Sequence, residues 1–317
     1  MKRLFPAVFL FPFVLTLGLS ARAQEEGPVK TQVLVGVDAK STPPSSASEI
    51  TISVNDRKEP VSAWAAVQPA NAQVALLIDS GLRESVGREL ENLRKFVADL
   101  PPGVEVMVGY LQYGSVVSEQ GFTSDHASAA SNVHLPAGMP GVSASPYLCI
   151  SDFVKKWPGS AVSSSDIGLG APVTHKARFI LVLTNGVDPY NGSTSVMNQD
   201  SPYVATAVED AQRAGVVVYS IYFGGAGIGG ESANFSGQGY LTQLTQETGG
   251  VNYYQGTRNP VSIAPFLDMF RHAVSETYIA TFNAPARKDP RDMMRVKISA
   301  PKAKLRAPEE VRPGNQE

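Results

Sequence analysis

Two short, continuous apolar runs most constrain how this chain can fold. Val74–Ile78 and Phe179–Leu183 contain only aliphatic, alanine or phenylalanine residues, and each run has polar residues on both sides. A strand of this kind is buried on both faces, as in a parallel sheet that is covered by helices. Apolar residues at helical spacing follow each run, which is typical of βαβ units. These patterns predict an α/β fold with a Rossmann-like, doubly wound, mostly parallel sheet.

The other elements of this central domain follow from the same patterns. Between Ser85 and Leu100, apolar residues recur every three or four positions and predict a helix. Gly114 is expected to turn the strand 104–112 back into an antiparallel partner over 116–122, which gives the sheet one antiparallel edge strand. Further elements are expected as helices 124–133, 146–157, 202–214, 240–248 and 265–275 and as strands 216–223 and 251–254.

The first 23 residues have the pattern of a secretory signal peptide. Lys2 and Arg3 precede an apolar run that ends at Leu19, and Ala21-Arg22-Ala23 matches a cleavage site. The run contains two prolines and is shorter than the roughly 20 residues of a membrane span, which favours cleavage over a retained anchor. We therefore expect an exported chain, periplasmic or extracellular, with no membrane span in its mature part.

Strand patterns also lie on either side of the central domain. Alternating runs at 32–39, 50–54 and 61–67 precede it, and runs at 278–282 and 294–299 follow it. We expect these segments to pair with each other as a small β-module. The alternative is that they add to the sheet of another chain, as in a structural protein of the cell envelope. The expected boundaries are a signal peptide 1–23, a β-extension 24–70, the central domain 71–276, C-terminal strands 277–307 and a disordered tail 308–317.

Composition excludes several classes of function. The signal segment holds three of the 27 basic residues and none of the 29 acidic ones, which leaves a formal charge of −5 on the mature chain. Such a chain lacks the clustered cations that nucleic acid or an anionic membrane surface requires. The single cysteine, Cys149, excludes a disulfide framework, a thiolate zinc site and an iron–sulfur cluster, and the four histidines have no metal-ligand spacing. We expect no redox cofactor.

Four loops at the predicted carboxyl ends of strands are the expected location of function, because ligands of doubly wound sheets bind there. These loops span 79–85, 141–147, 185–203 and 224–239. Tyr147, Tyr190 and Tyr203 lie on or beside them. Tyrosine is common on protein-recognition surfaces, although packing in the core is the alternative for each ring.

Three segments at these strand ends resemble a von Willebrand factor A-like domain of the bacterial, exported type that is described in acidobacteria. They are Ala75–Gly81, Leu181–Asp188 and Leu241–Gly250, and the resemblance covers about residues 50–307. It implies a non-enzymatic module for protein binding, adhesion or scaffolding that uses the loops at the strand ends. It also implies a protein partner, whose identity the chain does not specify.

The resemblance further implies a divalent-cation site, which is degenerate in this chain. Such domains hold the cation with a D-x-S-x-S motif on the first loop, a threonine on a second loop and an aspartate on a third. Here Asp79 is kept, while Gly81 and Arg83 replace the two serines. Arg83 would place a fixed positive charge where the family has a ligand oxygen.

The other two loops depart from the family pattern as well. The second loop offers only Ser143 or Ser145, and Asn185 replaces the aspartate of the third loop. Hard cations such as Mg²⁺ and Ca²⁺ are bound by several oxygen ligands, usually with at least one or two carboxylates. We therefore expect no tightly bound metal, with weak binding of Mg²⁺ or Ca²⁺ through Asp188 as the alternative.

Arg83 suggests a substitute for the cation. A guanidinium against the Asp79 carboxylate would leave a metal-free pocket that receives a carboxylate of the partner. The alternative is that Arg83 begins a helix and points into water, and a turn is the alternative role of Asp188. The predicted partner-binding residues are Asp79, Arg83, Tyr147, Asp188, Tyr190 and Tyr203.

No catalytic residue is expected. Gly225–Gly230 fits G-x-G-x-x-G, but this motif does not follow the first strand, and we expect a flexible loop there. The sequence has no G-x-S-x-G elbow, and no Ser-His-Asp set can be assembled from it. A binding module is therefore favoured over an extracytoplasmic hydrolase.

Overall fold

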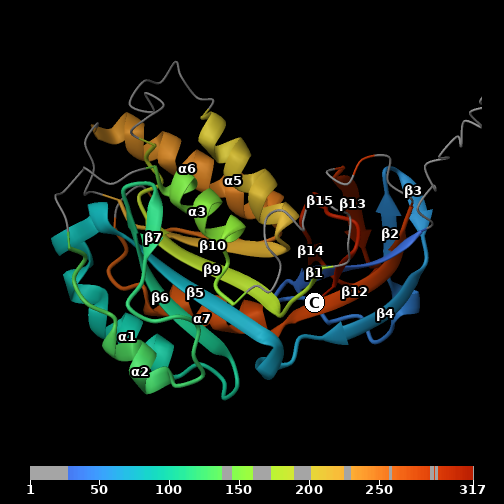
Figure 1. Cartoon of the computed structure of the whole chain (residues 1–317), viewed down its shortest axis with the longest axis horizontal. Helices are drawn as coiled ribbons and strands as arrows, with labels where there is room; N and C mark the ends of the chain where they lie inside the picture. Colours follow the sequence, from blue (N-terminus) through green and yellow to red (C-terminus); the bar gives the residue numbers. More distant parts are fainter. Residues whose placement is uncertain are drawn as a thin grey trace, which may run out of the picture.

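The computed structural model describes residues 28–137, 145–159, 173–188, 201–224, 230–256, 259–285, 289 and 292–316, without the side chains of 83–85, 173–174, 230–235 and 316. A central α/β domain and a β-module lie side by side (Figure 1). Within the described residues, no helix combines the length and the apolarity that a membrane crossing requires.

The central domain is built on a six-stranded sheet. Its strands are β5 (Ala72–Asp79), β6 (Glu105–Gln112), β7 (Ser115–Val117), β9 (Ala177–Thr184), β10 (Val216–Tyr222) and β11 (Asn252–Tyr253). Their order is β11-β10-β9-β5-β6-β7, and all neighbours are parallel except β6 and β7. The chain moves outward from β5 to β7 and then returns to β9, so the direction of winding reverses between β5 and β9. The predicted doubly wound sheet with one antiparallel edge strand is confirmed.

Helices cover both faces of this sheet (Figure 1). On one face lie α1 (Leu90–Ala98), α2 (His126–Ser131) and α7 (Ala264–Ser275), and on the other lie α3 (Pro146–Lys155), α5 (Pro202–Arg213) and α6 (Gly230–Glu247). Alternate side chains of β5 enter the two layers: Val74, Leu76 and Ile78 pack into the first, and Ala75 and Leu77 into the second. Because both faces are buried, the run is apolar at every position.

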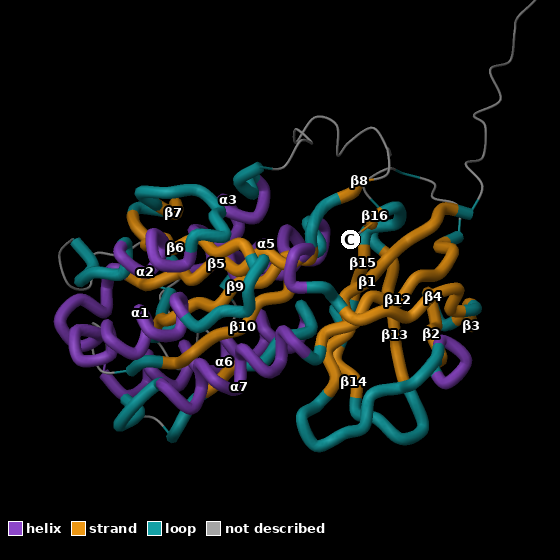
Figure 2. The backbone as a smooth tube through the Cα atoms, turned by 90° about the horizontal axis from the view of Figure 1, so that it is seen from below, coloured by secondary structure: helices purple, strands orange, loops and turns teal. Residues whose placement is uncertain are grey.

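The N- and C-terminal segments form the β-module, which consists of two antiparallel sheets (Figure 2). Its strands are β1 (Val29–Val37), β2 (Thr51–Val54), β3 (Arg57–Glu59), β4 (Val61–Ala66), β12 (Thr277–Ala284), β13 (Met294–Ser299), β14 (Leu305–Arg306) and β15 (Glu310–Val311). One sheet has the order β14-β1-β12-β4 and the other β15-β13-β2-β3. The terminal segments therefore pair with each other, with β1 antiparallel to β12. Val35, Ile52 and Phe282 fill the space between the sheets.

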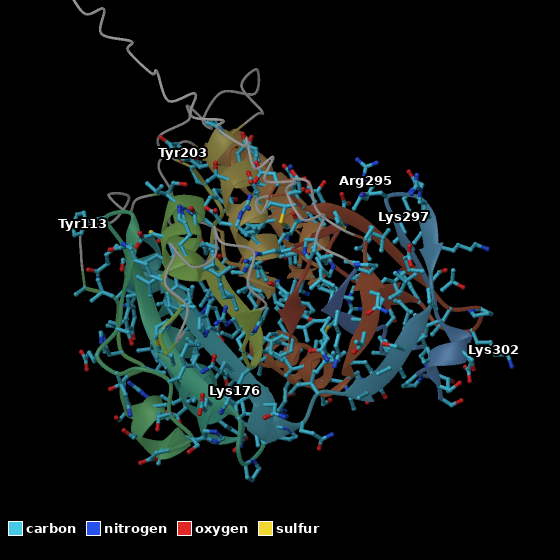
Figure 3. The ribbon with its side chains drawn as sticks, turned by 45° about the vertical axis from the view of Figure 1, so that its right-hand side comes forward. Tyr113, Lys176, Tyr203, Arg295, Lys297 and Lys302 are labelled. Atoms are coloured by element: carbon cyan, nitrogen blue, oxygen red, sulfur yellow. The ribbon has the colours of Figure 1, made fainter. Side chains whose placement is uncertain are left out.

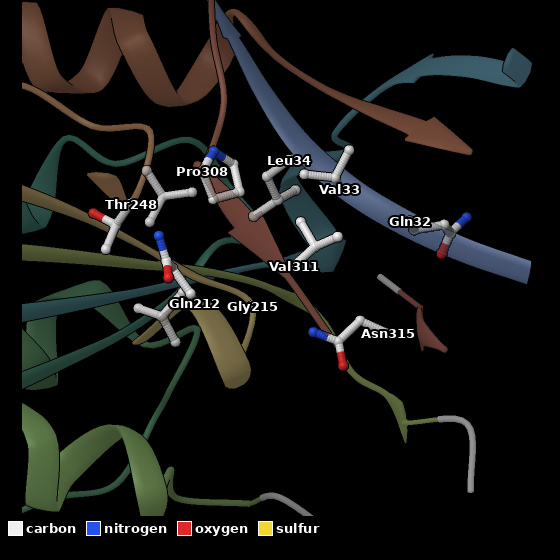
Figure 4. Close-up of a pocket in the computed structure, with 11 residues that line it drawn as sticks. Gln32, Val33, Leu34, Gln212, Gly215, Thr248, Pro308, Val311 and Asn315 are labelled. Atoms are coloured by element: carbon white, nitrogen blue, oxygen red, sulfur yellow. The ribbon is translucent and has the colours of Figure 1, made fainter. Parts of the chain in front are cut away.

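Residues 308–316 connect the β-module to the central domain, which differs from the disordered tail expected over 308–317. The Glu309 amide donates to the Glu247 carbonyl at 2.9 Å, and Arg312 is only 2% exposed. Gly249 has a φ of +88°, and a Cβ atom there would lie 2.9 Å from the Ala307 carbonyl carbon. Figure 4 shows this junction, where residues of β1 and of the ends of α5 and α6 surround the C-terminal segment. The polar composition of the segment concealed its burial. β16 (Asn315–Gln316) ends it, paired with β8 (Val173–Thr174).

Two further elements differ from the predicted ones. The helix expected over 85–100 divides into a 3₁₀ segment, Ser80–Glu89, and the α-helix α1. The loop expected over 224–239 is wrong from Gly230 onward, where α6 begins, and residues 225–229 lie outside the described part of the chain. Glycines lower helix propensity, and the three glycines of α6 conceal its first turns in the sequence.

Candidate functional site

The carboxyl ends of β5 and β9 meet where the winding of the sheet reverses. Asp79 ends β5 and Thr184 ends β9. The Thr184 hydroxyl donates to Asp79 Oδ2 at 2.6 Å, and the Gly81 amide donates to Asp79 Oδ1 at 2.8 Å. Asp79 is only 2% exposed, and Thr184 is fully buried. Burying a carboxylate without hydrogen-bond donors costs free energy. Each Asp79 oxygen accepts one of these two hydrogen bonds, which stabilise the carboxylate inside the protein.

The loop that follows β9 is fixed by three further hydrogen bonds. Thr184 Oγ1 accepts from the Gly186 amide at 3.1 Å, and Asn185 Oδ1 accepts from the Val187 amide at 3.0 Å. The Tyr147 hydroxyl, on α3, donates to the Gly186 carbonyl at 2.7 Å. Asn185, which stands where the resemblance implies an aspartate, therefore stabilises the turn that it begins.

Two glycines allow this loop to lie against α6. Gly186 has a φ of +68°, and a Cβ atom there would lie 2.5 Å from the Gly237 carbonyl oxygen. A Cβ atom on Gly237 would lie 2.2 Å from the Asn185 carbonyl oxygen. Neither position can accept a larger residue without moving the backbone, so the loop and the helix hold each other in place.

Tyr147 and Asp188, which we predicted to contact a partner, are both fully buried in this structure. Ser201 Oγ donates to Asp188 Oδ2 at 2.5 Å, and the rings of Tyr147 and Tyr240 meet edge to face at 6.0 Å. Burial raises the pKa of Tyr147 well above its usual value, and the nearby Asp188, Tyr240 and Asp79 act in the same direction. Tyr147 thus remains a protonated donor. Both side chains support the loops from inside.

The described residues do not fit a tightly bound divalent cation. Among the motif positions only Asp79 carries a carboxylate, and both of its oxygens accept hydrogen bonds. Gly81 brings no side-chain oxygen, and Asn185 Oδ1 is bonded to the backbone. The Ser145 hydroxyl caps α3 by accepting from the Leu148 amide at 3.4 Å. Within the part of the chain that the structure describes, no group of three or more His, Cys, Asp or Glu side chains could hold a metal ion.

Three predicted contact residues remain to be placed. The Arg83 side chain and the whole of Tyr190 lie outside the described residues, so their roles stay predictions. Tyr203, in the first turn of α5, is half-buried against the core layer under that helix. Figure 3 shows Tyr203 and Tyr113 toward the upper left, whereas Lys176, which precedes β9, lies at the bottom.

Tyr113 is a residue of this edge that the sequence patterns did not predict. It directly follows β6, and the pairing of Asp79 with Leu111 places it at the same end of the sheet as Asp79. Tyr113 and Gly114 have φ angles of +48° and +83°, as in the two-residue hairpin turn that favours Asn-Gly. A left-handed backbone costs a residue with a side chain about 1–2 kcal/mol. Tyr113 is 78% exposed, so core packing does not offset that cost.

The described titratable groups near the sheet do not resemble a nucleophile with its base. Cys149 is buried, and burial followed by the charge of Asp79 raises the pKa of its thiol to about 12. A thiol with that pKa is protonated at neutral pH and is a poor nucleophile. Ring nitrogens of His126, His134 and His175 contact backbone carbonyl oxygens.

No family model and no curated protein sequence matches this chain. Solved structures give remote similarities. A von Willebrand factor type A structure from Catenulispora acidiphila is 12% identical, with a TM-score of 0.42, over 93% of this chain and 76% of that chain. An aerotolerance-related membrane protein from Bacteroides fragilis, with multiple mutations to serines, is 14% identical, with a TM-score of 0.39, over 64% of this chain and 98% of that chain. A pilus adhesin from Lactobacillus rhamnosus GG, in an open conformation, is 10% identical, with a TM-score of 0.42, over 89% of this chain and 43% of that chain.

The central domain has the von Willebrand factor A-like fold that its strand-end residues implied. The sheet order, the helices on both faces and the single antiparallel edge strand agree with that architecture. Similarities of this size transfer no function, so the function has to be argued from the residues of this chain.

Proposed function

We propose that this protein is an exported, non-enzymatic binding module that contacts a protein partner through its rim and works without a tightly bound metal. The rim is the set of residues that follow the carboxyl ends of β5, β6 and β9, together with the first turn of α5. Among the described residues it comprises 80–83, 113–114, 185–188 and 203. The signal peptide expected over 1–23 supports export.

The single observation that carries this proposal is the combination of a left-handed backbone and high solvent exposure at Tyr113. Its backbone is left-handed, where asparagine or glycine is favoured, and its ring is exposed to solvent. An exposed tyrosine offers a partner a large contact area and a hydroxyl at low cost in side-chain entropy. A strained, exposed aromatic residue at the ligand-binding edge of a doubly wound sheet is best explained by recognition.

The buried network beneath the rim supports the same proposal. Asp79, Thr184 and Tyr147 are hydrogen-bonded to one another or to the loop after β9, and Gly237 holds that loop against α6. A loop that is already fixed loses less conformational freedom when a partner binds. In this account Asp79 positions the rim, and the partner is contacted by exposed residues such as Tyr113.

Site-specific photocrosslinking tests this proposal. The photoreactive residue p-benzoylphenylalanine replaces Tyr113 in one variant and Asn71 in another, in cells that export the chain. Asn71 is an exposed residue before the amino end of β5, at the opposite edge of the sheet. We expect a discrete protein adduct from position 113 and none from position 71. Equal adducts from both positions, or none from position 113, would contradict the proposal.

A further inference from the structure

The sheets of this protein end in very short strands, with one exception among the described residues. The edge strands β11, β14 and β15 have two residues each, and β3 and β7 have three. β4 also forms a sheet edge, beside β12, yet it has six residues. Short edge strands protect a protein from pairing with other chains, and β4 lacks this protection.

β4 also lacks the charged residues that commonly protect an edge. Its sequence is Val-Ser-Ala-Trp-Ala-Ala, whereas the neighbouring edge strand β3 is Arg-Lys-Glu. Within the described chain β4 pairs with β12 on one side and with no strand on the other. Ser62, Ala63, Ala65 and Ala66 are exposed. The pairing with β12 shifts register between Thr281 and Phe282, so the regular part of β4 runs from Ala63 to Ala66. Along this part the outer side of β4 offers backbone donors and acceptors beside small side chains.

The larger side chains of β4 are engaged within the β-module. The Trp64 ring stacks on Tyr278 with a centroid separation of 4.6 Å, and its Nε1 donates to the Pro44 carbonyl at 3.0 Å. Ser62 Oγ donates to the Thr281 carbonyl at 3.1 Å. Strand addition by a foreign peptide gains its specificity from pockets that receive alternate side chains. Methyl groups such as those of Ala63 and Ala65 form no such pocket, so the edge favours an occupant that is recognised by its backbone alone.

We propose that this occupant is a second copy of the chain, whose β4 pairs antiparallel to the first about a two-fold axis. Two four-stranded sheets would then join into one sheet of eight strands. A two-fold interface brings the same surface patch of each copy together. A charged residue on this strand would therefore lie close to the same charge on the other copy and be repelled by it. The absence of charge from Val61 to Ala66 removes that repulsion. β4 lies on the β-module, away from α1 and β7 (Figures 1 and 2), so pairing leaves both rims free.

Sedimentation equilibrium of residues 24–317 tests the pairing. We expect a reversible equilibrium between monomer and dimer that shifts to the monomer in the double variant A63K/A65K, because the lysines place positive charges on both edges. The matched control is A98K/A205K, which adds the same charge at two exposed helix positions and should keep the wild-type equilibrium. A wild-type chain that stays monomeric up to the highest soluble concentration, or a lysine variant that still dimerises like the wild type, would overturn the proposal.

A mixing experiment separates loss of pairing from loss of folding. The variant A63E/A65E carries the opposite charge on the same edge and should also be monomeric alone. Mixed in equal amounts, the lysine and glutamate variants should form a heterodimer, because opposite charges then face each other across the axis. Both variants should retain the wild-type circular dichroism. Failure of two folded variants to associate on mixing would contradict pairing through β4.

Discussion

The hydroxyl of Thr184 donates a 2.6 Å hydrogen bond to the carboxylate of Asp79, and it thereby joins the ends of two neighbouring strands at the switch point of the sheet. The resemblance noted in the sequence implies a cation ligand at the position of Asp79. In this chain the same carboxylate is satisfied by a hydroxyl and a backbone amide, which makes it a structural group beneath the rim.

Replacement of Thr184 by valine tests this structural role. Thr184→Val keeps the shape of the side chain but removes one donor from the buried Asp79 carboxylate. We expect the free energy of unfolding to fall by about 1–3 kcal/mol, the cost of a buried polar group left without its partner. Thr184→Ser keeps the hydroxyl and should lie closer to the wild type. Urea unfolding measures both, and equal stability of the two variants would argue against the role.

Two glycines of α6 provide a matched pair for the contact between helix and loop. A Cβ atom on Gly237 would clash with the Asn185 carbonyl oxygen, whereas one on Gly239 would meet no atom within 4 Å. Gly237→Ala should lower the free energy of unfolding by about 1–3 kcal/mol, as overpacking does. Gly239→Ala should raise it by about 0.5–1 kcal/mol, because alanine favours a helix. Denaturant unfolding of both variants checks the opposite signs.

Tyr113→Asn should separate stability from recognition. Asparagine tolerates the left-handed backbone, so the variant should gain about 1 kcal/mol in unfolding free energy. The same change removes the exposed ring, so photocrosslinking from position 203 to the partner should weaken. Thermal unfolding and adduct yield measure the two effects. A stabilised variant with undiminished crosslinking would show that Tyr113 is not a contact residue.

The ion pair between Lys176 and Glu105 predicts a pH effect at the amino ends of the strands. Burial alone would raise the pKa of Glu105, but hydrogen bonds from Lys176 and Gln73, each 2.8 Å long, outweigh burial and lower it. A lowered carboxyl pKa stabilises the fold above the usual glutamate pKa of about 4.3, and this stabilisation is lost as the pH falls through the lowered value.

Glu105→Gln isolates this contribution, because the other titrating groups contribute equally to the stability of both chains and cancel in the difference. The stability advantage of the wild type over Glu105→Gln should be largest near neutral pH and should shrink once the pH falls below the usual glutamate pKa. Urea unfolding across this pH range measures it. An advantage that stays constant or grows in acid would contradict the assignment.

The sheet could be predicted from sequence because burial on both faces leaves a direct signature. Val74–Ile78 and Phe179–Leu183 are apolar at every position, so their strands and the doubly wound order followed. α6 was foreseen only in its second half, because Gly237 is required by contact with Asn185, which lies 52 residues earlier in the chain. The ordered C-terminal segment was missed for a similar reason: Arg312 is buried by tertiary contacts that a polar sequence does not reveal.

The location of the candidate site could be predicted from the sequence, but the burial and the backbone conformation of its residues could not. Asp79 and Asn185 follow predicted buried strands, which placed them at one edge of the sheet. Whether Asp188 and Tyr147 face a partner or the core depends on the packing of α3 and α5, which periodicity does not specify. Tyr113 carried one local signal, a residue before glycine in a tight hairpin, and only the backbone geometry shows that it is strained.

Isothermal titration calorimetry of residues 24–317 with Mg²⁺, Ca²⁺ and Mn²⁺ tests most directly whether Asp79 is an internal group rather than a cation ligand. We predict no heat beyond dilution with any of the three ions at concentrations up to about 1 mM, equivalent to binding weaker than about 4 kcal/mol. Micromolar binding that disappears in Asp79→Asn would contradict the account.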